Sequence, residues 1–403
     1  MADKSEKTLG IYIHIPFCAS RCAYCDFCST AGRRDLIPAY QQALLRHMRE
    51  TAPRVESYLV DTVYFGGGTP SWYGAEYLAD LFGEMKELFR VKVDGEVTLE
   101  ANPDSVTQSG LTLLEKAGFN RISLGAQSAN DAILRDIGRR HDWAQVEKAV
   151  ETARGAGFKN LSLDLIYGLP GQSREDWADT LGKAMALRPE HLSCYGLKIE
   201  EGTPLWDRRE DPDIPDEDTQ ADLYLYAVEA LGAAGYAQYE ISNFARKGFA
   251  SRHNLKYWMG REYLGFGASA ASWLGGKRFT LLPDPEGYIA AINSGGELLS
   301  EVEDVSLYEQ ASEYVMLRMR TTRGMDARQY ESRYQNSFEP LEKLLEGYAR
   351  MGLAQRVGDR WHFTPRGFLL SNRLIGELLD AQAEQKYHMG LPWREEDYYN
   401  TLF

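Results

Sequence analysis

Short apolar runs alternate, along the first half of the chain, with longer segments in which apolar residues recur every three or four positions. The runs have the length of strands and are rich in β-branched and aromatic residues, whereas the spacing between them is helical. We expect strands at 11–17, 62–67, 96–102, 121–127, 161–167 and 191–199. We expect helices near 35–51, 75–89, 105–117, 142–156 and 174–187. This alternation predicts an α/β fold with a parallel sheet covered by helices.

The number of strand–helix units limits the architecture. Six units are two fewer than a closed eight-stranded barrel requires. A partial barrel and an open, doubly wound sheet both fit six units. The pattern of apolar positions does not choose between them.

The pattern changes after the sixth strand. An acidic, proline-containing stretch at 207–218 precedes an expected helix at 217–234, a glycine- and aromatic-rich stretch covers 244–288, and helical spacing returns from about 305. The expected organisation is a core barrel or sheet at 1–240, a connecting region at 241–300, a small, mainly helical domain of winged type at 301–383, and a tail at 384–403. The tail is either docked or disordered.

Composition narrows the function more than the fold. The chain has 403 residues, which favours two domains, and its net charge of −14 argues against broad binding to nucleic acid. No apolar run approaches the roughly 20 residues that span a bilayer, and the polar N-terminus lacks the order of a signal peptide. We therefore expect a cytoplasmic protein without a transmembrane segment, for which peripheral membrane association stays open.

Four of the five cysteines lie within eleven residues: Cys18, Cys22, Cys25 and Cys28. Such crowding favours metal or redox chemistry over a disulfide framework. Structural zinc usually takes two ligand pairs from separate segments, and no second pair exists here. The CxxxCxxC spacing instead suits a 4Fe–4S cluster on the first three thiols. Its fourth iron is then open either to Cys28 or to an external amine and carboxylate.

The cysteine loop, preceded by YIHIPF, resembles the radical S-adenosylmethionine (SAM) superfamily. More narrowly, it is similar to the oxygen-independent coproporphyrinogen III oxidase family. The resemblance implies a six-unit partial parallel β/α barrel, with SAM bound at the open iron. The segment FTPRGFLLSNRLIGELL at 363–379 also resembles the terminal domain of that family, so the resemblance covers nearly the whole chain.

The same resemblance assigns the cofactor-binding residues. The GGGTP turn has no phosphate-loop lysine, and its plain structural reading is a tight strand–helix turn. The family implies that this turn, with Gly67, Gly68 and Thr69, contacts the methionyl amine of SAM. It further assigns the ribose and carboxylate of SAM to Glu100, Gln127, Arg139 and Asp164, and places Tyr12 and Tyr24 along the same site. Singly, each could be an ordinary polar residue at the rim of a barrel.

A second motif, HNLKYW at 253–258, follows YEISNFA at 239–245. A histidine among aromatic residues is most often a buried, hydrogen-bonded core residue. The two segments nevertheless resemble the haem-chaperone branch of the family, which implies that His253 binds haem, and imidazole is a common axial ligand of haem iron. Ala271 stands where relatives often carry a histidine, so the side chain that would make a second contact with haem is absent at this position.

Two further features favour the haem-chaperone branch. The oxidases carry an extra cysteine at the position of Phe27, and they carry a long extension before the cysteine loop, whereas 17 residues precede Cys18 here. The leading hypothesis is a haem chaperone that binds a 4Fe–4S cluster, SAM and haem and transfers haem to acceptor proteins, such as those of the respiratory chain. It assigns no catalytic residue.

Two other classes of function stay open. One is a radical SAM enzyme that acts on a porphyrin-type substrate, or a related methyltransferase; coproporphyrinogen oxidase activity itself is not expected. The other is a plain electron carrier with Cys28 as the fourth ligand. An electron donor such as flavodoxin is compatible with the haem-chaperone hypothesis and with the radical SAM enzyme hypothesis. The sequence leaves both a monomer and a homodimer open.

Overall fold

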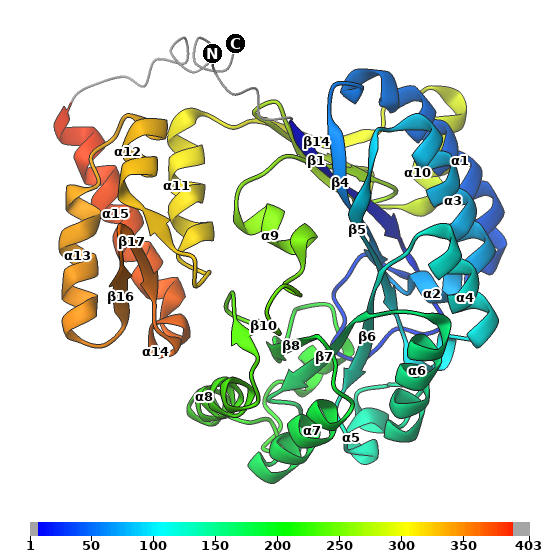
Figure 1. Ribbon diagram of the computed structural model, residues 1–403, viewed down its shortest axis with the longest axis horizontal. Helices are drawn as coiled ribbons and strands as arrows, with labels where there is room; N and C mark the ends of the chain where they lie inside the picture. The colour runs from blue at the N-terminus through cyan, green and yellow to red at the C-terminus, as the bar shows by residue number, and fades with distance from the viewer. Residues whose placement is uncertain (1–6, 390–403) are drawn as a thin grey trace.

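The computed structural model describes residues 7–389 and contains a partial parallel β/α barrel, as expected (Figure 1). Its six principal strands pair in parallel and in chain order. They are β1 (Thr8–Ile15), β4 (Leu59–Gly67), β5 (Val91–Ala101), β6 (Arg121–Gln127), β7 (Asn160–Tyr167) and β8 (His191–Gly196). Because parallel strands end at one edge of a sheet, side chains at their carboxyl ends come together there.

Helices cover the outer face of these strands (Figure 1). They are α1 (Ile37–Thr51), α3 (Ala75–Leu88), α4 (Gln108–Ala117), α6 (Trp143–Ala156), α7 (Arg174–Ala186) and α8 (Glu217–Ala233). In α3 the buried residues Leu78, Leu81, Phe82 and Met85 follow helical spacing, so one face packs on the sheet. None of the helices that the structure describes is long and apolar enough to cross a membrane.

Shorter elements complete the barrel, and several flank the cysteine loop. They are β2 (Phe17–Cys18), β3 (Thr30–Ala31), α2 (Pro70–Tyr73), α5 (Asp131–Asp136) and the 3-10 turns Arg34–Leu36, Ala52–Val55, Pro103–Ser105 and Pro204–Arg208. Strands β2 and β3 pair with each other and close the base of the loop.

The segment expected as a connecting region, 241–300, also extends the sheet. Strand β11 (Tyr263–Phe266) pairs in parallel with β1, so the chain returns to its first strand. The segment also contains β10 (Asn243–Ala245), α9 (Arg252–Trp258), β12 (Ala271–Leu274), β13 (Lys277–Leu281) and α10 (Pro285–Ser294), and β14 (Leu299–Asp304) begins at its end. At the other edge, β10 joins β8 to β9 (Ala237–Gln238) in antiparallel pairing. Helix α9 lies in the opening between the two edges of the sheet (Figure 1).

The C-terminal part has a hydrophobic core of its own, distinct from the core of the barrel. Its elements are α11 (Leu307–Arg318), β15 (Met325–Asp326), α12 (Ala327–Tyr334), α13 (Glu339–Arg350), β16 (Ala354–Val357), β17 (Arg360–Phe363), α14 (Pro365–Leu369) and α15 (Ser371–Met389). Helix α15 continues into the first residues of the expected tail; residues 390–403 lie outside the described part of the chain.

Candidate functional site

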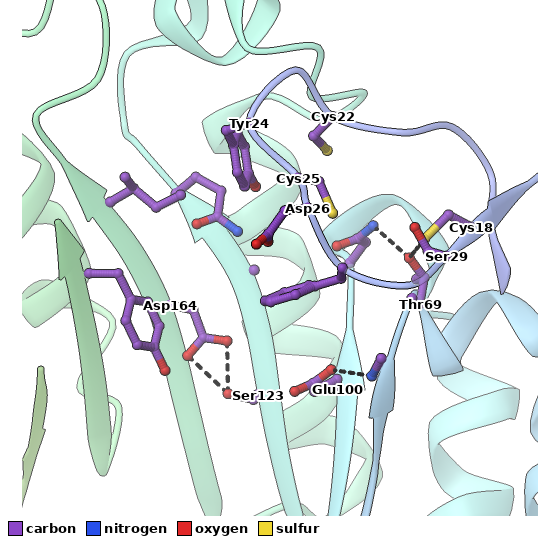
Figure 2. A pocket seen from close by; sticks show the side chains of 18 of the residues that line it. Cys18, Cys22, Tyr24, Cys25, Asp26, Ser29, Thr69, Glu100, Ser123 and Asp164 are labelled. Carbon is purple, nitrogen blue, oxygen red and sulfur yellow. Dashed lines mark hydrogen bonds between the residues drawn. The ribbon is translucent and has the colours of Figure 1, made fainter. Parts of the chain in front are cut away.

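The cysteine loop crosses the carboxyl ends of the strands, above a cavity of about 360 Å³ that we call the main cavity. The thiols of Cys18, Cys22 and Cys25 line it, and Figure 2 shows them above Glu100 and Asp164. Backbone hydrogen bonds hold the loop in place: Gly68 N–H donates to the Ile15 carbonyl at 2.9 Å, and Thr69 N–H donates to the Phe17 carbonyl at 2.8 Å. The GGGTP turn, at the end of β4, therefore supports the cysteine loop from below.

Each of two thiols receives a hydrogen bond from a neighbouring side chain. Thr69 Oγ1 donates to Cys18 Sγ at 3.4 Å, and Arg139 Nη1 donates to Cys22 Sγ at 3.5 Å. Burial raises the pKa of Cys18 and of Cys25, whereas a cation beside a thiol favours its ionised form. Three free thiols on one loop are the donor set that a cubane with one open iron takes.

The arrangement of these donors also shows whether the site could bind a single metal ion. Within residues 7–389, no three His, Cys, Asp or Glu side chains lie close enough to hold one metal ion. A cubane differs from a single ion in that each thiolate binds a separate iron, so its ligands need not meet at one point.

The fourth cysteine of the loop has a different environment. Cys28 Sγ donates a hydrogen bond to the Pro283 carbonyl at 3.0 Å, and Cys28 lines a second cavity rather than the main one. Phe27 lines both cavities, and 64% of its surface is exposed. The loop therefore directs Cys28 away from the cavity that the other three thiols line.

The GGGTP turn depends on its glycines. Gly67 has φ of +113°, a conformation that side chains disfavour. A Cβ on Gly68 would lie 2.8 Å from the Phe17 carbonyl oxygen and 3.0 Å from Cys18 Sγ. Only glycine therefore lets the turn pack directly beneath the cysteine loop, where its backbone faces the main cavity.

Glu100, the penultimate residue of β5, is half-buried at the wall of the main cavity. It accepts hydrogen bonds from the Tyr64 hydroxyl at 2.6 Å and from the Gly67 N–H at 3.1 Å. Burial raises the pKa of Glu100 to about 7 in spite of these donors. The carboxyl group can therefore change its charge near neutral pH.

Asp164, in β7, lies deeper in the same cavity. It accepts hydrogen bonds from the hydroxyl groups of Ser193 at 2.7 Å, Ser123 at 2.9 Å and Ser162 at 3.3 Å. Burial raises the pKa of Asp164, and the three hydroxyl groups oppose that shift. The serines fix the direction of the carboxylate toward the cavity.

Arg139 and Gln127 complete the upper wall. Arg139 Nη2 donates to the Gly125 carbonyl at 2.7 Å and to Asn102 Oδ1 at 2.8 Å, which fixes its guanidinium plane. The Arg139 Nε is buried without a hydrogen-bond partner among the described residues. Gln127 adopts φ of +64° beside an irregularity in the β6–β7 register, which turns it into the cavity.

Nearly all of the residues assigned to SAM meet in the main cavity. Those that line it are Tyr24, Gly67, Gly68, Thr69, Glu100, Gln127, Arg139 and Asp164. Tyr12 instead lines the second cavity, of about 350 Å³, with Phe27, Cys28, Tyr257 and Tyr263 among its other walls. Gly67 and Glu100 line both cavities, so the two lie next to each other.

The structure places His253 outside both cavities. It is 1% exposed; its Nδ1 is hydrogen-bonded with Thr62 Oγ1 at 2.9 Å and its Nε2 with the Tyr257 hydroxyl at 2.8 Å. Burial lowers the pKa of His253 to about 3, so the ring is neutral. In this arrangement both ring nitrogens are occupied within the protein.

Its neighbours on α9 do reach the cavities. Asn254 lines the main cavity, and Tyr257 lines the second. Glu96 holds the start of the helix, accepting from the backbone N–H of His253 at 2.9 Å and of Arg252 at 3.0 Å.

Several lining residues lie outside the set expected from the sequence. They include Asn102, Arg121, Ser123, Ser193 and Tyr195. For Asn102 a signal exists in the chain, since Glu96, Thr98 and Glu100 alternate with apolar residues in an expected strand and Asn102 is the next position of that alternation. Side chains two positions apart share one face of a strand, so Glu100 marks the inward face of the barrel.

The barrel and its cysteine loop define the class of protein. Residues 12–184 match the family model described as "Radical SAM superfamily", and residues 305–370 match the "HemN C-terminal domain". The solved structure of coproporphyrinogen III oxidase (HemN) from Escherichia coli is similar, with a TM-score of 0.82 and 25% identity, over 94% of this chain and 91% of that one. The chain is therefore a member of the radical SAM superfamily.

Relatives over the full length give the family. The chain is 35% identical to "Heme chaperone HemW" of Lactococcus lactis, over 93% of this chain and 98% of the relative. It is 34% identical to the protein of that name from Bacillus subtilis, over 91% and 98%, and 33% identical to that from Escherichia coli, over 91% and 97%. The chain belongs to the HemW family.

Proposed function

We propose that this protein is a cytoplasmic haem chaperone that binds haem and delivers it to acceptor proteins, among them proteins of the respiratory chain. The observation that carries the proposal is the full-length relationship to proteins named as heme chaperones. The presence of Phe27 at the position of the additional oxidase cysteine supports it.

The main cavity suits a 4Fe–4S cluster and SAM. Cys18, Cys22 and Cys25 would hold the cluster, and the backbone of the GGGTP turn would approach the methionyl group. Glu100 and Asp164 would accept hydrogen bonds from ribose hydroxyl groups, while Arg139 would face the carboxylate. When bound, the cluster and SAM supply one-electron chemistry; in this proposal they regulate haem transfer or dimerisation.

The second cavity is the proposed seat of haem. Its aromatic walls, Tyr12, Tyr257 and Tyr263, suit a flat macrocycle, and it adjoins the cysteine loop through Phe27. His253 does not line it, so a haem iron in this cavity would reach the imidazole only after a local rearrangement. Its Nε2 faces the Tyr257 hydroxyl, however, and Tyr257 is a wall of that cavity. A rotation of the Tyr257 side chain would uncover a neutral imidazole nitrogen.

A radical SAM enzyme acting on a porphyrin-type substrate is the second candidate. The structural similarity to coproporphyrinogen III oxidase and the gathering of the SAM-assigned residues in one cavity favour it. Reconstituted protein should be given reductant and SAM anaerobically, with and without coproporphyrinogen III, and 5′-deoxyadenosine should be measured. In parallel, haem-loaded protein should be mixed with apomyoglobin and the absorbance spectrum followed.

The two functions give different results in this experiment. The chaperone proposal expects haem to pass to apomyoglobin and the porphyrinogen to leave 5′-deoxyadenosine formation unchanged. Strong formation of 5′-deoxyadenosine that depends on the porphyrinogen, without haem transfer, would favour the enzyme instead.

A further inference from the structure

A cleft of about 420 Å³ lies at the amino-terminal ends of the barrel strands, away from the cysteine loop. Thr8 and Asp61, near the starts of β1 and β4, form one side of it. Helix α9 and the C-terminal part of the chain form the rest. The cleft contains six cationic side chains, Arg252, Lys256, Arg261, Arg318, Arg323 and Arg360, against the two carboxylates of Asp61 and Asp326. We call it the basic cleft.

Three of the six cations have carboxylate partners. Lys256 Nζ lies 2.7 Å from Asp61 Oδ1, Arg360 Nη2 lies 3.4 Å from Asp326 Oδ2, and Arg252 Nε lies 3.9 Å from Glu96 Oε2. The other three are Arg261, Arg318 and Arg323. None of these has an ion pair with any carboxylate of residues 7–389.

Arg318 is the most constrained of these three. It is 4% exposed, and its guanidinium lies over the Tyr314 ring at 5.1 Å and contacts Met259, through the sulfur and through the carbonyl oxygen, which accepts from Nη2 at 3.4 Å. Burial lowers its pKa to about 10, and the nearby charges of Arg323 and Arg261 act in the same direction. A buried charge without a counter-ion is unfavourable, and like charges beside it add to the cost.

The overall charge of the chain makes this concentration unexpected. With a net charge of −14, the protein has an excess of carboxylates that could have neutralised the cleft. Instead, three guanidinium groups converge on one hollow without a carboxylate partner. Guanidinium groups match the oxygens of phosphate in geometry and charge.

We propose that the basic cleft binds a phosphate-type oxyanion through Arg261, Arg318 and Arg323. The cleft offers almost no apolar wall, only Leu255 and Met259, so the phosphate itself is the recognised group. It comes either from a soluble phosphate compound or from a phospholipid headgroup. Because Arg261 lies in the turn after α9 and Arg318 and Arg323 belong to the C-terminal part, a bound anion would tie these two parts together. The inference is independent of haem binding.

The test uses inorganic pyrophosphate as the probe, in calorimetric titrations at constant ionic strength set with sodium chloride. Arg261→Gln and Arg323→Gln remove exposed charges, and Arg366→Gln, an exposed arginine on α14, is the control of equal charge change. Each cleft variant should weaken pyrophosphate binding about tenfold, the loss of about 1.4 kcal/mol that one charge-assisted contact supplies. The control should bind as the wild type does. Equal weakening in Arg366→Gln, or no binding of pyrophosphate by the wild type, would overturn the proposal.

Vesicles distinguish the source of the phosphate. If phosphatidylglycerol vesicles bind the wild type, phosphatidylcholine vesicles do not, and pyrophosphate displaces the protein, then a lipid headgroup is the source. If pyrophosphate binds and neither kind of vesicle does, the source is soluble. Vesicle binding that Arg261→Gln and Arg323→Gln leave intact would contradict a role for the cleft.

Discussion

His253 and Tyr257, one turn apart on α9, are joined by a hydrogen bond of 2.8 Å between the imidazole Nε2 and the phenol hydroxyl. The two rings meet edge to face, at a centroid distance of 5.1 Å. Only Tyr257 lines the second cavity. The tyrosine therefore lies between the histidine and the proposed seat of haem, and its hydroxyl would compete with a haem iron for the same nitrogen.

Removal of the Tyr257 hydroxyl tests this competition. Tyr257→Phe keeps the aromatic wall and frees Nε2 of a hydrogen bond worth about 1 kcal/mol, so haem affinity should rise about fivefold. Haem titration followed in the Soret band measures it. Tyr263→Phe is the matched control, since it removes a hydroxyl from the same cavity without touching His253. A weaker affinity in Tyr257→Phe than in the control would show that the phenol helps to bind haem rather than blocking it.

The cysteine loop gives a prediction about cluster ligands. Cys22→Ser should lose most of the reconstituted iron, because Cys22 lines the main cavity and receives the Arg139 hydrogen bond. Cys28→Ser should retain it, because its thiol is turned to the Pro283 carbonyl. Iron and sulfide contents after anaerobic reconstitution decide between the two. Loss of the cluster in Cys28→Ser would restore the electron-carrier hypothesis.

The pKa of Glu100 predicts a pH dependence of SAM binding. Burial raises this pKa to about 7, so the carboxylate is present above that pH and protonated below it. Ribose hydroxyl groups donate to the ionised form, so SAM affinity should fall as the pH drops from 8 to 6. Glu100→Gln should bind SAM weakly and without this dependence, whereas Glu76→Gln, on the outer helix α3, should behave as the wild type. Equilibrium dialysis at several pH values measures it, and a wild-type affinity that stays constant from pH 6 to 8 would contradict the role of Glu100.

The anchoring of α9 predicts a loss of stability. Glu96 accepts hydrogen bonds from two backbone N–H groups at the start of this helix. Glu96→Ala should leave these buried donors unpaired and lower the free energy of unfolding by about 1–3 kcal/mol. Urea denaturation measures the change. Asp94→Ala, at an exposed position two residues earlier in β5, should have little effect, and an equal loss in both variants would contradict the anchoring role.

The sequence predicted the barrel well because its signals are local. The expected strand at 161–167 lies within β7, Asn160–Tyr167. Its two ends were easy to place, because a dense apolar run lies between a helix and a turn that contains glycine and proline. The choice of a partial barrel came from resemblance to a family, and the structure confirms it. Strand β11 was missed because it is short and its pairing with β1 joins residues about 250 positions apart.

The features of the candidate site also divide into those that local sequence patterns predict and those that depend on contacts between distant residues. Residues at strand ends could be placed together from sequence, because parallel strands end at one edge. The surroundings of His253 could not, because Thr62 lies 191 positions away and no local pattern pairs the two. The basic cleft also has no sequence pattern, since its arginines are spread from Arg252 to Arg360 and only the packing of α9 against the C-terminal part brings them together.

Haem titration of the wild type beside His253→Ala tests the haem-chaperone proposal most directly. Both proteins should first show equal cluster content and equal urea midpoints, so that a difference reports on the ligand and not on folding. The expected result is a saturable Soret shift in the wild type and its loss, or at least about a tenfold weaker affinity, in His253→Ala. An unchanged affinity and spectrum in His253→Ala would contradict the assignment of this histidine, and no Soret shift in either protein would contradict haem binding itself.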